Sequence, residues 1–171
     1  HHFTKLLNNT TLPFYWTAFE TIPQAAFEPV EGKPRHAQLM AAAQLLKQDG
    51  VTIIDDAFNS NPHGSAMALE VLATFTAGKR IVITPGMIEL GAGQREHNRT
   101  LGRNMAASCD VAIVVGEFNR DAIVTGLVDE GFPAEQTIVV ASFAEATAKL
   151  REIAAPGDTV LYENDLPDTF K

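Results

Sequence analysis

The stretch that most constrains the fold of this chain runs from Val51 to Pro62 and reads V-T-I-I-D-D-A-F-N-S-N-P. Its first four residues are all apolar or β-branched, which is typical of a strand buried on both faces of a sheet. The carboxylates of Asp55 and Asp56 cannot remain in such a core without partners, so the strand must end at one of these two residues.

A polar loop and a helix are predicted after this strand. Asn59, Ser60 and Asn61 are residue types preferred in turns and at helix caps, and a proline such as Pro62 suits the first helical position. Apolar residues then recur at helical spacing, at Met67, Val71, Leu72 and Phe75. Hydrogen-bonding groups therefore gather at the carboxyl end of the strand and the start of the helix, which is where ligands bind in open α/β sheets.

The rest of the chain alternates in the same way. Further strands are predicted over residues 81–84, 111–115, 137–140 and 159–162, and helices over residues 94–108, 120–130 and about 142–154. Ser142 with Glu145 forms a capping-box pattern at the start of the last helix. Five strands separated by helices require right-handed crossovers, so the predicted fold class is α/β with a mostly parallel sheet covered on both faces.

Two segments near the N-terminus are less regular. His1 and His2 are interpreted as a remnant of a purification tag, and the rest of residues 1–31 as a linker or lead-in. Residues 32–171 are interpreted as one domain.

Residues 36–48 leave two structures open. Their composition favours a helix, whereas Asp49-Gly50 before the apolar strand is a hairpin signal, because this pair tolerates the positive φ angles of a tight turn.

Composition excludes several classes of function. The formal net charge is -8 without a basic cluster, which argues against a nucleic-acid partner. No apolar run reaches membrane-spanning length and no signal peptide is visible, so we expect no membrane insertion. The single cysteine, Cys109, cannot form an internal disulfide, and we therefore expect a reducing cytoplasmic setting with Cys109 as a buried residue.

Motif searches exclude several kinds of site. A P-loop requires G-x-x-x-x-G-K-[ST], but Ala77–Arg80 lacks the leading glycine and the hydroxyl residue. The dinucleotide pattern G-x-G-x-x-G is absent after the first strand. A receiver domain would need an aspartate after the third strand and a lysine after the fifth, where the chain has Glu117 and Glu163. No His/Cys cluster has zinc-binding spacing, so no metal site is expected.

The block D-D-A-F-N-S-N-P resembles the C-terminal domain of the Mur ligases, whose members carry D-D-x-[YF]-N-[AS]-N-P. Further matches are T-P-G-M-I-E-L-G at Thr84–Gly91, Glu96-His97, Leu101-Gly102 and Val114–Glu117, so the resemblance covers Pro29 to the C-terminus. It implies a Rossmann-like three-layer sandwich with a mostly parallel sheet of about six strands and one antiparallel strand. It also favours a strand within residues 36–48.

The resemblance implies an ATP-dependent amide ligase of peptidoglycan precursor synthesis. The block is most similar to the type that adds D-alanyl-D-alanine to UDP-N-acetylmuramoyl-tripeptide through an acyl phosphate. In that family an N-terminal domain holds the UDP-sugar, a central domain carries the P-loop and holds most of the ATP and Mg²⁺, and the C-terminal domain closes over both. The C-terminal domain alone is expected to be inactive.

The resemblance also implies roles for particular residues. Arg35 is expected to reach the ATP phosphates, where a guanidinium can stabilise the transferring phosphoryl group, although a solvated loop arginine would look the same. Asp56 is expected to help hold the nucleotide, and a helix-capping carboxylate is compatible with that role.

Four polar residues and one acid complete the expected site. By the resemblance, Asn59, Ser60 and Asn61 match the loop that lines the amino-acid pocket in the family, where such side chains could hold a carboxylate. Ordinary turns prefer the same residue types. Relatives often read K-G-S-R near the last strand, whereas this chain has acidic residues there, which leaves Asn164 and Asp165 as candidates to meet the amine of the acceptor.

His97 shares a helical stripe with Leu101 and Met105, which predicts a half-buried structural histidine and not a catalytic base.

Two other functions remain open alternatives to the ligase domain described above. The domain could be a free-standing module that binds a small carboxylate or a nucleotide. It could also belong to a sister ligase of the folylpolyglutamate synthase type with a different acceptor.

Overall fold

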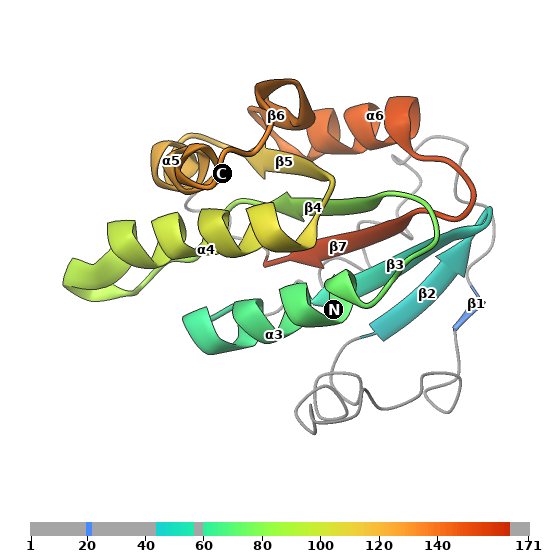
Figure 1. Cartoon of the computed structure of the whole chain (residues 1–171), viewed down its shortest axis with the longest axis horizontal. Helices are drawn as coiled ribbons and strands as arrows, with labels where there is room; N and C mark the ends of the chain where they lie inside the picture. The colour runs from blue at the N-terminus through green and yellow to red at the C-terminus, as the bar shows by residue number, and fades with distance from the viewer. Residues whose placement is uncertain (1–19, 22–43, 57–59, 165–171) are drawn as a thin grey trace.

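The computed structural model describes residues 20–21, 44–56 and 60–164, which form a seven-stranded sheet with helices packed against it (Figure 1). The strands are β1 Glu20–Thr21, β2 Gln44–Gln48, β3 Val51–Asp56, β4 Arg80–Thr84, β5 Val111–Val115, β6 Thr137–Val140 and β7 Thr159–Glu163. The helices are α3 Pro62–Ala73, α4 Gln94–Ser108, α5 Arg120–Asp129 and α6 Phe143–Ile153, with short 3-10 turns at Gly91–Gly93 and Ala134–Gln136.

The strands follow one another across the sheet in the order β1-β2-β3-β7-β4-β5-β6. The five strands from β3 to β6 in this order are parallel, β2 runs antiparallel to β3, and β1 pairs antiparallel with β2. The predicted α/β class and mostly parallel sheet are therefore confirmed. The expected count of about six strands with one antiparallel strand differs, because the two-residue strand β1 adds a seventh strand and a second antiparallel pairing.

The hairpin between β2 and β3 decides one of the open alternatives. Asp49 and Gly50 form its turn, with φ angles of 49° and 80°, as the Asp-Gly pair predicts. Residues 44–48 are a strand paired with β3, for example Leu45 with Ile54. The hairpin pairing with β3 overrides the helical propensity of this part of the segment. Residues 36–43, and all of 1–31 except β1, lie outside the described residues.

The two faces of the sheet carry separate apolar cores. One core packs under α3, α4 and α5 and includes Ile54, Val82, Val114 and Leu161. The other packs under α6 and includes Ile53, Ile83, Ile113 and Tyr162. Because side chains alternate along a strand, Asp56 and Glu163 point to the same side as Ile54 and Leu161, while Asp55 points to the α6 side.

The side of α4 that packs on the sheet differs from the predicted one. Its buried stripe runs through Asn98, Leu101, Gly102 and Met105, and His97 is exposed. The prediction of a half-buried His97 is therefore wrong. His97 shares a stripe with Leu101 at helical spacing, but it lies one step of about 100° away from Asn98, on the solvent side.

Cys109 is buried, as predicted, at the end of α4. Burial raises the pKa of its thiol to about 12, and the charge of Asp110 acts in the same direction. A thiol with such a pKa is protonated at neutral pH and is a poor nucleophile. Within residues 20–21, 44–56 and 60–164, no helix has the length and apolar character needed to cross a membrane.

Candidate functional site at the carboxyl edge of the sheet

The carboxyl ends of β3 and β7 bring the polar residues of the expected site together. β3 and β7 are parallel neighbours, and Asp56 is the register partner of Glu163. Register partners on adjacent parallel strands have side chains on the same face, here the face covered by α3. We call Asp56, Ser60, Asn61, Glu163 and Asn164 the rim.

Asn61 caps the N-terminus of α3. Its side-chain Oδ1 accepts hydrogen bonds from the backbone N–H groups of His63, at 3.1 Å, and Gly64, at 2.9 Å. Turn and cap chemistry is thus present at Asn61, as one of the two open interpretations expected. The first turn of α3 contains no acidic residue, so the positive end of the helix dipole is not neutralised by a side chain of its own helix.

Glu163 is the rim residue that the sequence argument did not single out. It is fully buried, and its Oε1 accepts a hydrogen bond from the hydroxyl of Ser60. Burial raises the pKa of the Glu163 carboxyl well above its ordinary value, and the charge of Asp56 raises it further. Both effects favour the protonated form of the Glu163 carboxyl.

Asp56 is only partly exposed, and its pKa is raised to about 6. Burial is the largest cause, the hydrogen bond with Glu163 acts in the opposite direction, and the charge of Asp55 adds to the increase. At neutral pH Asp56 carries the negative charge of the pair. The rim thus presents a single partly exposed carboxylate next to the start of α3.

Asn164 ties three segments of the rim together. It is 4% exposed and has a φ of 68°. Its backbone N–H donates to the Asp56 carbonyl at 3.3 Å, its Oδ1 accepts from the Ser60 N–H at 3.4 Å, and its Nδ2 donates to the Gly86 carbonyl at 2.6 Å. Its burial and its bonds to three separate segments favour a positioning role for Asn164.

The loop after β4, which contains Gly86 and Met87, is held by side-chain amides from two helices. Asn98 is fully buried. Its Oδ1 accepts from the Met87 N–H at 2.8 Å, and its Nδ2 donates to the Met87 carbonyl at 2.9 Å. Asn119 donates to the carbonyls of Pro85, at 3.0 Å, and Met87, at 3.1 Å. Because Gly86 accepts from Asn164, these amides also position the rim.

Replacing Asn98 by Ala is expected to lower the free energy of unfolding by about 2–3 kcal/mol, because the buried N–H of Met87 would lose its acceptor. Urea unfolding followed by circular dichroism measures this effect. Asn104, on the same helix, is partly exposed, and Asn104→Ala is the matched control, with an expected change within about 0.5 kcal/mol. Equal stabilities of the two variants would contradict the assigned role of Asn98.

The structure brings together four of the residues predicted for the site, Asp56, Ser60, Asn61 and Asn164. The other three, Arg35, Asn59 and Asp165, lie outside the described residues. Glu163 and Asn98 were not predicted as site residues from the sequence. Glu163 directly follows an apolar strand, as Asp56 nearly does, and this shared position is the signal that could have revealed the pair.

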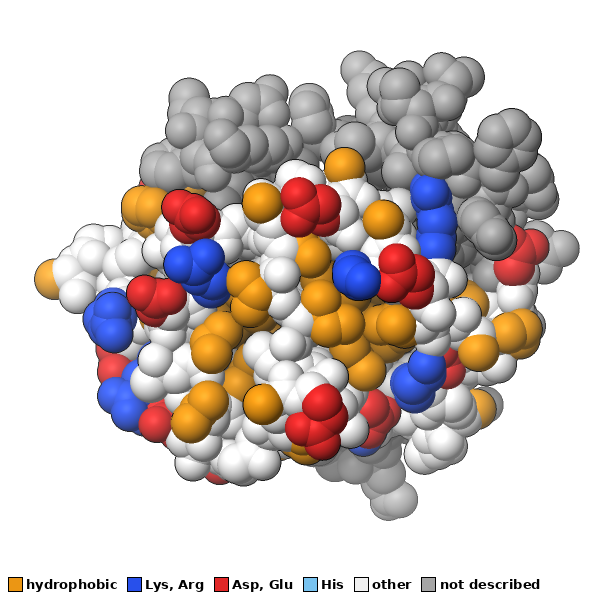
Figure 2. Space-filling model, turned by 90° about the horizontal axis from the view of Figure 1, so that it is seen from above, with side chains coloured by type: hydrophobic (Ala, Val, Ile, Leu, Met, Phe, Trp, Pro, Cys, Tyr) orange, Lys and Arg blue, Asp and Glu red, His pale blue; other side chains and the backbone are white. Residues whose placement is uncertain are grey.

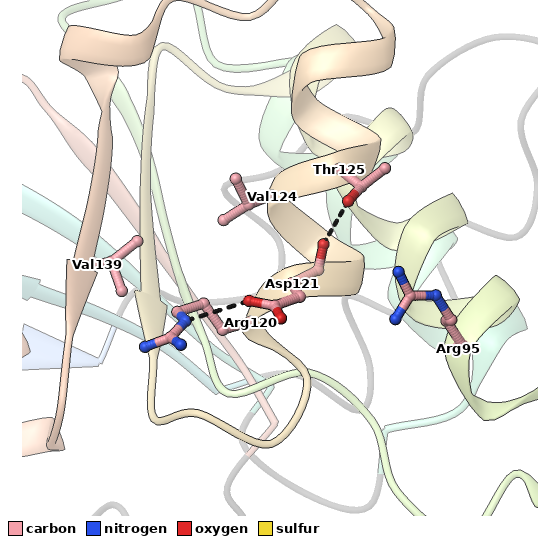
Figure 3. Close-up of a pocket in the computed structure, with 6 residues that line it drawn as sticks. All are labelled: Arg95, Arg120, Asp121, Val124, Thr125 and Val139. Carbon is pink, nitrogen blue, oxygen red and sulfur yellow. Dashed lines mark hydrogen bonds and ion pairs between the residues drawn. The ribbon is translucent and has the colours of Figure 1, made fainter.

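A separate shallow pocket of about 600 Å³ lies between α4, α5 and β6. It is lined by Arg95, Arg120, Asp121, Val124, Thr125 and Val139 (Figure 3). The space-filling view, taken from above relative to Figure 1, shows apolar side chains gathered near the centre of the visible surface, with basic and acidic side chains around them (Figure 2). None of the residues predicted from the sequence lines this pocket, so the rim remains the candidate site.

Lowering the charge of the rim should change how stability depends on pH. Between about pH 4 and pH 6 folded Asp56 still binds a proton that the unfolded chain has released, because its pKa is raised to about 6. The contribution of Asp56 to the free energy of unfolding should therefore fall as pH rises through this window and stay constant at higher pH. We expect Asp56→Asn to remove this fall and to be more stable than the original chain at pH 7, by about 1–2 kcal/mol.

Urea unfolding of both proteins at pH 4.5, 5.5 and 6.5 measures this difference. The comparison must be made between the two proteins at each pH, since other carboxyls have shifts of the opposite sign. Asp110, for example, has its pKa lowered by its hydrogen bond with Arg80. A stability difference that is independent of pH would contradict the raised pKa of Asp56.

The fold and the rim define the class of protein. It is an open α/β sheet with a polar rim at the carboxyl end of its strands, next to a helix N-terminus, and this edge is where ligands bind in sheets of this architecture. The family model described as "Mur ligase, glutamate ligase domain" matches residues 43–162. The chain belongs to this family, and the resemblance seen in its sequence is confirmed.

Two curated relatives illustrate the similarity. The UDP-N-acetylmuramoyl-tripeptide–D-alanyl-D-alanine ligase of Mycobacterium leprae is 34% identical over 134 residues, which cover 68% of this chain and 26% of the relative. The UDP-N-acetylmuramoylalanine–D-glutamate ligase of Hydrogenovibrio crunogenus is 27% identical over 145 residues, which cover 82% of this chain and 29% of the relative. The chain thus spans between a quarter and a third of the length of these relatives.

A solved structure shares the fold. The MurF ligase of Thermotoga maritima in complex with ADP superposes with a TM-score of 0.60 at 22% identity, over 82% of this chain and 29% of that one. This similarity supports the α/β architecture of the domain.

Proposed function

We propose that this chain is the C-terminal domain, residues 32–171, of a cytoplasmic ligase that joins D-alanyl-D-alanine to UDP-N-acetylmuramoyl-tripeptide. The observation that carries this proposal is the 34% identity with a ligase of that name, over 68% of this chain. The rim supports it, because small polar groups beside a helix N-terminus suit an anionic ligand.

In the proposed reaction, ATP transfers its terminal phosphoryl group to the tripeptide carboxylate. The amine of D-alanyl-D-alanine then attacks the acyl phosphate, an amide bond forms, and inorganic phosphate leaves. The N-terminal and central domains of the same protein would bind the UDP-sugar and most of the ATP. As the family resemblance implies, Mg²⁺, which neutralises phosphate charge, would be held mainly by the central domain.

The rim residues would act when the domains close. Asp56 is the partly exposed carboxylate that would contact the nucleotide, and Arg35 would contact its phosphates. Asn59, Ser60 and Asn61 would face the acceptor. Asn61 is exposed, so its amide nitrogen can donate to a carboxylate while its oxygen caps α3. Asn164 would hold these groups in place, and Asp165 would meet the amine.

One observation favours a second candidate. The D-glutamate ligase of Hydrogenovibrio crunogenus matches a larger share of this chain, 82%, so D-glutamate is the alternative acceptor. Phosphate release by the intact ligase distinguishes the two. We expect release with UDP-N-acetylmuramoyl-tripeptide and D-alanyl-D-alanine, and only background release with UDP-N-acetylmuramoyl-alanine and D-glutamate. The opposite result would replace the proposed acceptor.

The isolated chain provides a further test. Calorimetric titration with ATP and, separately, with D-alanyl-D-alanine should give no measurable binding, because most contacts would come from the other domains. Tight binding of either ligand by this chain alone would favour a free-standing binding module over a ligase domain.

A further inference from the structure

The side chain of Glu163 presents a hydrogen-bonding problem in its buried position. Its Oε1 accepts from the Ser60 hydroxyl. Its Oε2 is buried and has no donor among the described residues. A buried carboxylate oxygen without a donor is costly, and such atoms are rare in folded proteins. The ionised form of Glu163 therefore does not fit its surroundings.

A proton on Oε2 solves this problem. Asp56 and Glu163 are register partners on neighbouring parallel strands, with both side chains on the same face of the sheet, and each carboxyl shifts the pKa of the other in the way that a hydrogen bond between them does. Two carboxyl groups can form such a bond only when one of them carries a proton. The proton belongs on Glu163, because Glu163 is fully buried and Asp56 reaches solvent. Since Oε1 is taken by Ser60, Oε2 is the donor.

We propose that Glu163 is a positioning residue that acts as a neutral carboxylic acid. Its Oε2–H donates to the Asp56 carboxylate, and its Oε1 accepts from the Ser60 hydroxyl. One side chain on β7 thus bridges the last residue of β3 and a residue that precedes α3. Asp56 is held in a fixed orientation at the rim, with its charge kept and its free lone pairs available to a ligand.

The other charged groups around this pair are compatible with the bridge. On β3, Asp55 points to the opposite face of the sheet, and its charge raises the pKa of Asp56. On β7, Tyr162 also points to the opposite face, in the core under α6. The first turn of α3 has no acidic side chain, and His63 there is exposed. Glu89, in the loop after β4, is exposed.

Carbon-13 NMR of the 171-residue chain, with labelled Glu and Asp carboxyl groups, tests the bridge directly. We expect the Glu163 carboxyl carbon to keep the chemical shift of a protonated acid at pH 7, and the Asp56 carbon to titrate near pH 6. Glu163→Gln assigns the signal, and Glu130→Gln, at an exposed position on the end of α5, is the control. Titration of Glu163 in the ordinary acidic range would overturn the proposal.

Two substitutions separate the bridge from simple packing. Glutamine can donate to Asp56 and accept from Ser60, so Glu163→Gln should leave the Asp56 titration and the Ser60 amide signal near their original positions. Glu163→Leu fills similar space without either bond, so the pKa of Asp56 should rise and the Ser60 amide signal should move. Equal effects of the two substitutions would overturn the proposal. If the leucine variant does not fold, the Glu163 signal of the original chain still decides.

The consequence for nucleotide binding rests on the proposed function. In the intact ligase, Glu163→Leu should raise the KM for ATP about tenfold, because Asp56 loses its fixed orientation, and Glu163→Gln should restore it. An unchanged KM together with a protonated Glu163 signal would support the bridge and remove the nucleotide role of Asp56. A failure of the proposed bridge can therefore be told apart from a failure of the proposed nucleotide role of Asp56.

Discussion

Replacing Gly126 by Ala is expected to lower the free energy of unfolding by about 2–4 kcal/mol, because α4 and α5 cross with their backbones in contact. A Cβ on Gly126 would lie 2.0 Å from the carbonyl oxygen of Arg99, and a Cβ on Gly102 would lie 2.1 Å from the carbonyl oxygen of Ile123. Both obstacles are backbone atoms of a neighbouring helix, so relief requires the helices to separate.

The expected loss of stability in Gly126→Ala is opposite in sign to the intrinsic helix propensity, which favours Ala over Gly by about 1 kcal/mol. It would also exceed the contribution of the ion pairs across the same crossing. Arg99 and Arg103 both bond Asp129, at 2.7 Å and 3.0 Å, but exposed pairs of this kind contribute about 0–1 kcal/mol. The close packing of α4 and α5 therefore depends more on the lack of a Cβ at Gly102 and Gly126 than on the ion pairs between the two helices.

Urea unfolding of the chain measures the effect. Gly64→Ala in α3 is the matched control, since its Cβ would meet its nearest atom, in the Asn61 side chain, at 3.4 Å. Its expected change is within about 1 kcal/mol. A Gly126→Ala variant as stable as the Gly64→Ala variant would show that the two helices can move apart at little cost.

Replacing Arg35 by Ala in the intact ligase is expected to lower turnover by about 10²- to 10³-fold. A guanidinium that contacts a transferring phosphoryl group stabilises charge that develops in the transition state, and removal of one such donor has an effect of this size. The expectation rests on the resemblance and on the proposed function, because Arg35 lies outside the described residues.

Steady-state phosphate release measures this effect, and thermal unfolding checks that the variant folds. Lys33→Ala, two positions earlier in the same basic segment, is the matched control and should keep most of the turnover. Near-normal turnover in the Arg35→Ala variant would remove the role assigned to this residue.

Much of the fold could be predicted because its signals are local. The bounds of α4, β5 and β6 agree with the sequence prediction, since apolar periodicity, Gly and the turn residues mark both ends of each element. Ser142 caps α6 by accepting from the Glu145 N–H at 3.2 Å, as the capping box predicts. The Asp49-Gly50 turn likewise follows from two adjacent residues.

The site was only partly predictable because its remaining residues are joined across the sheet. Ser60 and Glu163 are 103 positions apart in the chain, and they meet because β7 inserts between β3 and β4. The burial of Asn98 and the exposure of His97 depend on which side of α4 packs against its neighbours. A difference of one residue rotates a helix face by about 100°, and no local pattern fixes that choice when polar residues line both sides.

The sequence by itself determined the strand that ends in paired carboxylates, the polar loop, the helix cap at Asn61 and the family to which they belong. These depend on residue types within a few positions of one another, whose backbone preferences are local. Only the tertiary structure decided that Asp56 lies beside a second, fully buried acid. Strand order and register place that neighbour, and burial in turn decides which of the two carboxyls keeps its proton.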